Sequence, residues 1–224
     1  VNSVQAATTV STFMDGFPGM GIKQSSATTT LIRFQATTSD SGVSVTAVNA
    51  NFSGTGFATT TLADLTALGT SGVSIYVDNG DGLLNTASDT FVPLATNPAW
   101  TGMTSNIVLT PATPVALTAG IGKTFFVAVK TRSTAGSGAQ IIATLPATVG
   151  VITSAQTGGA GPTTSFSAPS RVVDSAVPTI VSVSGYVGIG SRTLTVRFSE
   201  PVQKVPSGAL SAAEFTFNDL GSPN

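Results

Sequence analysis

Apolar and polar residues alternate along much of the chain, and this period of two is the pattern of half-buried β-strands. The clearest examples are Ala27–Ala36 (ATTTLIRFQA), Val43–Phe52 (VSVTAVNANF) and Lys123–Arg132 (KTFFVAVKTR). Shorter runs predict further strands at Val73–Asp78, Thr90–Leu94, Asn106–Thr110, Pro114–Thr118 and Ala139–Leu145. With about eight to ten short strands separated by turns, the pattern predicts an all-β fold of the Ig-like β-sandwich type.

One segment departs from this pattern. Leu62, Leu65 and Leu68 recur at three-residue spacing and are followed by Gly69, so Thr60–Leu68 is predicted to be a short helix. The turn residues Asp40–Gly42 are expected to connect the first two strands.

The composition also predicts how the chain is divided. We expect an irregular segment over residues 1–26, the sandwich over 27–170, a linker over 171–178 and an incomplete Ig-like domain over 179–224. Strands of that last unit are predicted at Thr179–Ser184, Arg192–Ser199 and Glu214–Asn218. An Ig-like domain needs about 100 residues. We expect that the chain is a fragment; the alternative is that a neighbouring chain supplies the missing strands. The start at Val1 rather than Met separately indicates a processed or excised chain.

Charge is scarce and nearly balanced. Charged residues make up 8% of the 224 residues, and the formal net charge is −1, whereas about a quarter of the residues in an ordinary soluble domain are charged. No basic face is available to hold a phosphate backbone, so nucleic-acid binding is not expected. No apolar run approaches 18 residues, so no membrane span is expected either.

Two residue types that dominate enzyme chemistry are missing. The sequence contains no His and no Cys. This excludes imidazole bases, thiolate nucleophiles, thiolate zinc sites, iron–sulfur clusters and disulfides. Glutamate occurs only at Glu200 and Glu214, and no pair of carboxylates is spaced for acid–base work. The chain is therefore expected not to be an enzyme.

The segment Asp78–Asp89 (DNGDGLLNTASD) is the one motif that carries chemistry. Three of the chain's Asp residues fall within it, together with two Asn and two Gly. Calcium takes six to eight hard oxygen ligands from a loop tight enough to bring them together, and glycines allow the necessary backbone reversals. The predicted ligands of a Ca²⁺ ion are Asp78, Asn79, Asp81, Leu83 (through its carbonyl), Asn85 and Asp89.

The match to an EF-hand loop is incomplete. One residue is missing between Asp78 and Asn79, and Asp89 stands where a bidentate Glu would close the loop. The three Asp residues are therefore firmer candidates than Asn79 and Asn85. The alternative interpretation is a polar hairpin turn without a metal, because Asp-Asn-Gly runs are common in turns.

The same stretch carries a resemblance to known families. A strand that ends in an aromatic, then DNGDG, a hydrophobic pair and a later Asp resembles the calcium-loop β-sandwich modules of bacterial surface proteins. Ala116–Ile141 is similar to the strand pair that follows in such modules. Val173–Val205, with FSEPV at Phe198–Val202, resembles the start of an S-layer-type Ig-like domain, and Ala209–Phe217 fits its next strand.

These resemblances imply a non-catalytic, extracellular structural module at a bacterial cell surface, stabilised by calcium. Its expected partners are copies of itself or neighbouring domains of the same surface protein. Two alternatives remain open: a filament subunit completed by a β-strand from its neighbour, and an accessory or adhesin domain that binds glycan. The glycan alternative predicts an exposed aromatic platform from residues such as Tyr76, Trp100, Phe125 and Phe126.

Overall fold

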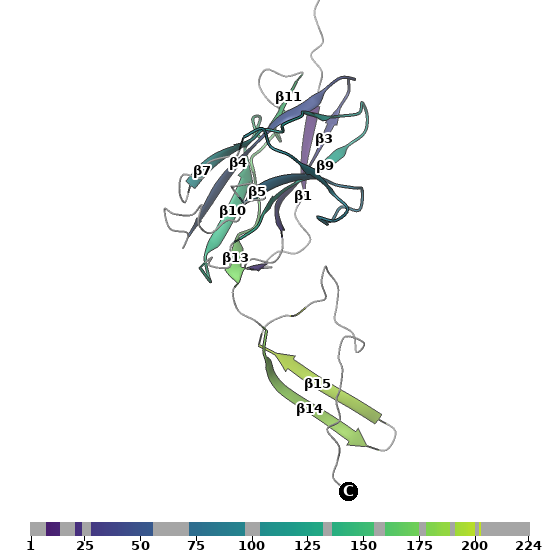
Figure 1. Cartoon of the computed structure of the whole chain (residues 1–224), viewed down its shortest axis with the longest axis vertical. Coiled ribbons are helices and arrows are strands. Elements are labelled where there is room, and N and C mark those ends of the chain that lie inside the picture. Colours follow the sequence, from purple (N-terminus) through teal and green to yellow (C-terminus); the bar gives the residue numbers. More distant parts are fainter. Residues whose placement is uncertain are drawn as a thin grey trace, which may run out of the picture. The chain divides into compact units, whose positions relative to one another are not determined.

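The computed structural model describes residues 8–13, 21–23, 28–55, 72–96, 104–131, 136–154, 160–174, 178–188, 191–199 and 202. All regular secondary structure in these ranges is β, as predicted (Figure 1). Backbone contacts divide the chain into two compact units, Val1–Ser175 and Ala176–Asn224. No helix within the described ranges is long and apolar enough to cross a membrane.

The first unit contains a five-stranded antiparallel sheet. Its strands are β1 (Thr8–Phe13), β3 (Thr29–Thr38), β9 (Lys123–Val129), β5 (Val73–Val77) and β6 (Thr90–Val92), in this spatial order. Strands β1 and β6 therefore form its two edges. The central strands are rich in β-branched and aromatic residues, which suit a sheet that is covered on both faces.

A second sheet is built around β4 (Ser44–Thr55), the longest strand. Its antiparallel partners are β7 (Thr104–Leu109), β8 (Val115–Ala116), β10 (Gln140–Leu145) and β11 (Val151–Thr153). Beyond β10 lie β12 (Phe166–Ser167) and β13 (Arg171–Asp174), and β13 pairs in parallel with β2 (Ile22–Lys23). Most of the second sheet is thus antiparallel as well.

The two sheets share one hydrophobic core. Phe34 and Phe125 come from the five-stranded sheet, Phe52 and Ile141 come from the second sheet, and all four are almost fully buried in the same cluster. The rings of Phe34 and Phe125 stack with centroids 5.1 Å apart and planes 7° from parallel. Two antiparallel sheets around a common core are consistent with a β-sandwich.

Strands were well predicted where the alternation was long. The segments predicted over Ala27–Ala36, Val43–Phe52, Lys123–Arg132 and Ala139–Leu145 are confirmed as β3, β4, β9 and β10, with shifted ends. The five shorter or later predictions at residues 73–78, 90–94, 106–110, 114–118 and 192–199 are confirmed as β5, β6, β7, β8 and β15 (Ser191–Phe198). The strand expected from Thr179 is also confirmed, as β14 (Ile180–Gly188).

The connection at Asp40–Gly42 differs from a simple hairpin. Although β3 and β4 follow one another in the chain, β3 pairs with β1 and β9, and β4 pairs with strands of the other sheet. The turn therefore carries the chain from one layer to the next. Each strand contributes its alternate residues to the shared core, so the period of two alone does not tell a hairpin from a crossover.

The structure contains strands that the pattern did not predict. Strands β1 and β2 lie within residues 1–26, which were expected to be irregular, and β13 lies within the expected linker. β2, β12 and β13 are two to four residues long, too short for alternation to mark them. The predicted helix at Thr60–Leu68 and the predicted strand at Glu214–Asn218 lie outside the described residues.

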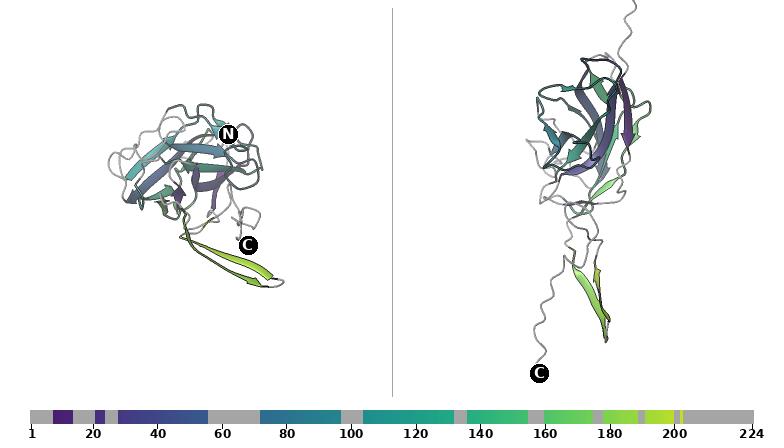
Figure 2. Two further views of the ribbon diagram at one scale, coloured as in Figure 1. Left: turned by 60° about the horizontal axis from the view of Figure 1, so that its bottom comes forward. Right: turned by 90° about the vertical axis from the view of Figure 1, so that its right-hand side faces the viewer.

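The second unit contributes the antiparallel pair β14 and β15. Both views in Figure 2 show these two strands side by side, and no further strand pairs with them among the described residues. Ile180, Val181 and Val183 of β14 are more than half exposed. A two-stranded sheet with apolar residues in contact with solvent is only marginally stable on its own.

We predict that the shared core carries most of the stability of the first unit. Phe34→Ala removes a fully buried ring and should lower the free energy of unfolding by about 3–5 kcal/mol. Phe91→Ala in the same sheet is the matched control, because Phe91 is 41% exposed, and it should cost roughly 1 kcal/mol. Urea unfolding followed by far-UV circular dichroism measures both, and equal losses would contradict the assignment of the core.

Candidate metal-binding loop

The loop Asp78–Asp89 connects the paired strands β5 and β6. Val77 lies opposite Thr90 in the register, so the strands end immediately before Asp78 and begin again immediately after Asp89. The Asp78 N–H donates to the carbonyl of Thr124 on β9 at 3.1 Å, which extends the sheet by one further bond. The first and last carboxylates of the loop are therefore anchored at the end of a rigid hairpin.

The structure brings the three Asp residues of the loop together. One carboxylate oxygen from each of Asp78, Asp81 and Asp89 lies within 4.8 Å of the others. Asp89 is buried, Asp78 is half-buried and Asp81 is exposed. No Lys or Arg within the described part of the chain forms an ion pair with any of them. Such a group of hard oxygen ligands could hold a metal ion.

Backbone N–H groups fix the orientation of the two anchored carboxylates. Asp78 Oδ1 accepts hydrogen bonds from Gly80 N at 3.0 Å and from Gly82 N at 3.1 Å. Asp89 accepts from Asn79 N at 3.0 Å through Oδ1 and from Asn85 N at 2.7 Å through Oδ2. The Asp89 carboxylate thus connects both halves of the loop. Hydrogen bonds from N–H groups to a carboxylate are stronger than hydrogen bonds between two neutral groups.

A second set of hydrogen bonds forms three local turns. The side-chain Oδ1 atoms of Asn79, Asp81 and Asn85 each accept the N–H group two residues further on, at 3.1, 2.8 and 3.1 Å respectively. These are Asx-turns, the reason that Asn and Asp favour such loops. Each of these oxygens keeps lone-pair capacity for a metal. The predicted ligand roles of Asn79, Asn85 and the Leu83 carbonyl remain predictions.

Glycine is required at two positions of the loop. Gly80 and Gly82 have φ values of +113° and +74°, which side chains of L-residues rarely adopt. The backbone reversal at Gly82 lets its N–H group reach Asp78 while its carbonyl faces the sheet. The conformation of the loop therefore accounts for the two glycines of the DNGDG sequence, whether or not a metal is bound.

The loop is also held against the outer face of the five-stranded sheet, the face away from the shared core. Leu84 packs on a small buried cluster formed by Tyr76, Phe126 and Ala128. Arg33 on β3 donates from Nη1 to the Gly82 carbonyl at 2.6 Å. Sequence reasoning did not identify Arg33 or Leu84 as part of the site. The available signal was a single cationic residue within an otherwise uncharged strand, ATTTLIRFQA.

Tyr76 is one of the residues of the outer face that Leu84 covers. Burial raises the pKa of the Tyr76 phenol above its usual value, and hydrogen bonds with Thr28 and Ser74 partly oppose that shift. A raised pKa means that the fold favours the neutral phenol, so this contribution to stability is present at neutral pH and is lost only in strongly alkaline solution. The ring also contacts Phe91, with centroids 5.5 Å apart.

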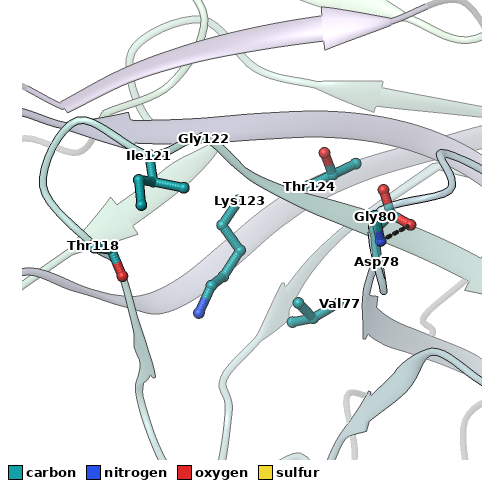
Figure 3. A pocket seen from close by; sticks show the side chains of 8 residues that line it. All are labelled: Val77, Asp78, Gly80, Thr118, Ile121, Gly122, Lys123 and Thr124. Carbon is teal, nitrogen blue, oxygen red and sulfur yellow. Dashed lines mark hydrogen bonds between the residues drawn. The ribbon is translucent and has the colours of Figure 1, made fainter.

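A shallow pocket of about 180 Å³ lies beside the loop (Figure 3). It is lined by Val77, Asp78, Gly80, Thr118, Ile121, Gly122, Lys123 and Thr124. The Lys123 ammonium donates to the Ala116 carbonyl at 2.6 Å, and the Asp78 carboxylate accepts the backbone bonds described above. Both charged groups of the lining are therefore engaged in structural contacts, and they do not form an acid–base pair.

The aromatic platform considered for glycan binding is not found in the described residues. Tyr76, Phe125 and Phe126 are each no more than 3% exposed, so their faces are closed to a sugar. Trp100 lies outside the described residues. Phe91 is the one aromatic ring of the loop hairpin with substantial exposure, at 41%.

Comparisons with known proteins place the chain in no family. No protein-family model matches it. No curated protein matches it either. Among solved structures, it is similar to AvmM, which catalyses macrocyclization in alchivemycin A biosynthesis, with 13% identity over 77% of this chain and 92% of AvmM and a TM-score of 0.38.

A second similar structure is a DUF4466 family protein from Parabacteroides merdae. The match has 12% identity, covers 80% of this chain and 48% of that protein, and has a TM-score of 0.31. Both similarities are too distant to carry an argument about activity. What the geometry supports is an all-β protein with antiparallel sheets and a carboxylate cluster that could hold a metal ion.

We predict opposite effects of two loop substitutions when no metal is present. In EDTA, Asp89→Ala should cost about 1–3 kcal/mol of unfolding free energy, because it removes the buried acceptor of two N–H groups. Asp81→Asn should be neutral or slightly stabilising in EDTA, because it removes one of three crowded negative charges and keeps the Asx-turn oxygen. Thermal unfolding measures both, and a large loss for Asp81→Asn in EDTA would show that repulsion within the cluster is unimportant.

We also predict that a side chain at Gly82 destabilises the chain. Gly82→Ala should cost roughly 1–2 kcal/mol because of its positive φ, although the added Cβ would meet Arg33 Nη1 only at 3.5 Å. Gly136→Ala is the control, since it has open space around it and no positive φ, and it should change stability by less than about 1 kcal/mol. Equal stability of the two variants would contradict the loop conformation described here.

Proposed function

We propose that the chain is a non-catalytic structural module of a bacterial surface protein, and that its Asp78–Asp89 loop binds a calcium ion that stabilises the sandwich. The observation that carries the proposal is the approach of three carboxylates to within 4.8 Å, on a loop whose backbone holds them in place. Like charges this close raise the energy of the folded state, and a divalent cation removes that cost.

The chemistry of the ligands favours calcium over other common metals. The cluster offers only oxygen, without the imidazole or thiolate that zinc and copper prefer. Backbone carbonyls and amide oxygens of the same loop are available to raise the ligand number toward the six to eight of calcium. Magnesium demands stricter octahedral geometry and keeps its waters, so it should bind more weakly.

A structural rather than catalytic role is supported by what the chain offers around this site. His and Cys are absent from the sequence, and the pocket beside the loop holds one carboxylate and one ammonium that are both hydrogen-bonded to the backbone. Neither group is placed to transfer a proton to a substrate.

An extracellular location is proposed from composition and from the sequence resemblance to bacterial surface modules with an Ig-like sandwich. Millimolar calcium is available outside cells, and extracellular calcium sites bind in about the 10⁻⁴–10⁻³ M range. A chain without disulfides gains from another source of stabilisation there. At about 1 mM calcium, a site with a dissociation constant in this range would add about 0.4–1.4 kcal/mol.

We predict that calcium raises the thermal unfolding midpoint of the full chain. A titration from EDTA into millimolar Ca²⁺ should produce a rise of the midpoint, since about 0.4–1.4 kcal/mol corresponds to roughly 1–6 °C in a domain of this size. Asp81→Ala should abolish the rise, because it removes a ligand. Mg²⁺ at the same concentration should give a smaller rise.

The matched control for this experiment is Asp40→Ala. Asp40 is an exposed Asp in the turn between β3 and β4 and lies outside the carboxylate cluster. It should keep the full calcium response. A midpoint that ignores calcium in the unmodified chain would reduce the loop to a hydrogen-bonded turn and would remove the basis of the proposal.

A second candidate function rests on the hairpin of the second unit. Strands β14 and β15 form a two-stranded sheet whose residues Ile180, Val181 and Val183 are 54–60% exposed. Such an edge can accept a strand from a neighbouring molecule, as in a self-assembling filament. Sedimentation of the full chain distinguishes the two functions, because strand exchange predicts concentration-dependent assembly that Val181→Lys and Val183→Lys suppress.

A further inference from the structure

A continuous row of side chains crosses the outer face of the five-stranded sheet. The register places Phe13, Arg33, Phe126, Tyr76 and Phe91 opposite one another, one from each strand from β1 to β6. The Arg33 guanidinium carbon lies 4.8 Å from the centre of the Phe13 ring, and the Tyr76 and Phe91 rings are also in contact. The row connects one edge of the sheet with the other.

Arg33 is the residue at which the metal-binding loop meets this row. Its Nη1 donates to the Gly82 carbonyl at 2.6 Å, while the Gly82 N–H group donates to Asp78 of the carboxylate cluster. The Nε atom of Arg33 is buried without a hydrogen-bond partner in the described part of the chain. The position of the guanidinium therefore depends on one loop carbonyl on one side and on the Phe13 ring on the other.

Strand β1 is the element that this contact secures. It is an edge strand of six residues, and β3 is its strand partner in the sheet. Val10 packs toward the shared core, whereas Phe13 lies on the outer face under Arg33. An edge strand with few contacts opens more readily than a central strand, so one added contact changes its opening equilibrium substantially.

We infer that Arg33 is a positioning residue that couples metal binding in the Asp78–Asp89 loop to the docking of strand β1. The inference rests on the proposed metal site. With a cation bound, the loop is held closed and the Gly82 carbonyl keeps the guanidinium over Phe13. Without it, repulsion among Asp78, Asp81 and Asp89 increases the fraction of molecules in which the loop is open, so Arg33 loses its acceptor more often and the hold on β1 weakens.

Such coupling must act in both directions. If metal binding favours docked β1, then weakening the docking of β1 must lower metal affinity by the same factor. This reciprocity does not require Phe13 to lie near the loop. Phe13 belongs to the edge strand β1, and three strands separate β1 from β6, the edge strand that follows the loop. An Arg33 variant alone is not diagnostic, because removing its positive charge favours a nearby cation while losing its hydrogen bond loosens the loop.

The test is a double-mutant cycle on calcium affinity, measured by titration calorimetry on the full chain. Phe13→Ala should weaken Ca²⁺ binding about five-fold, the lower end of usual couplings between sites. In an Arg33→Met background, Phe13→Ala should cause no further change. Ser11→Ala is the matched control, since Ser11 is an exposed residue of the same strand whose truncation does not weaken the docking of β1, and it should leave affinity within about two-fold.

Hydrogen exchange provides a second readout that needs no Phe13 variant. Calcium should slow exchange of the amides of residues 8–13 in the unmodified chain and should not do so in Arg33→Met. If the chain binds calcium but Phe13→Ala keeps full affinity and β1 exchange ignores the metal, the coupling is overturned while the metal site stands. If the unmodified chain binds no calcium, both the site and the coupling are overturned.

Discussion

The close approach of three carboxylates on one short loop is the interaction on which the proposed metal site and its coupling to β1 depend. Asp78, Asp81 and Asp89 converge within 4.8 Å, and backbone N–H groups from the same loop donate to all three of them. Those N–H groups offset part of the charge, but they do not remove it. A bound cation would complete the compensation, which is why we propose that the stability of this loop depends on a metal ligand.

The five-stranded sheet makes this arrangement possible. Its inner face contributes Phe34 and Phe125 to the common core, and its outer face presents Tyr76 and Phe126 as a platform for Leu84. The loop is thus packed on the sheet rather than projecting from it. Arg33 lies on β3, two strands beyond the hairpin that carries the loop, and reaches the loop from the same face. This contact is the physical basis of the coupling to β1 that we propose.

The sequence predicted the parts of this structure that depend on local pattern. Long alternating runs such as KTFFVAVKTR predicted strands, because every second side chain must enter the core. The sequence DNGDG, followed by a later Asp, predicted a loop that brings carboxylates together. This was possible because Asx-turns and positive-φ glycines are determined by neighbouring residues in the sequence. In both cases the signal lay within about a dozen residues.

What was missed depends on contacts between distant segments. Alternation did not show that β3 and β4 belong to different sheets. Strand β13 was not predicted, because its residues were assigned to a linker, although it pairs with β10 and β2. Arg33 stood out as the single cationic residue of its strand, but its partner could not be predicted because the acceptor lies 49 residues away in the sequence. The burial of Phe126 and Tyr76 on the outer face likewise follows only once Leu84 covers them.

The most direct measurement of the central claim is a calcium titration of the isotope-labelled chain followed by amide NMR. If the loop binds the metal, the signals of Gly80, Gly82 and Leu83, whose N–H groups donate to Asp78 or Asp81, should move together and saturate at one ion per chain. The signals of β14 and β15 should stay in place. Unchanged loop amides at millimolar calcium, or shifts spread evenly over the chain, would contradict the account.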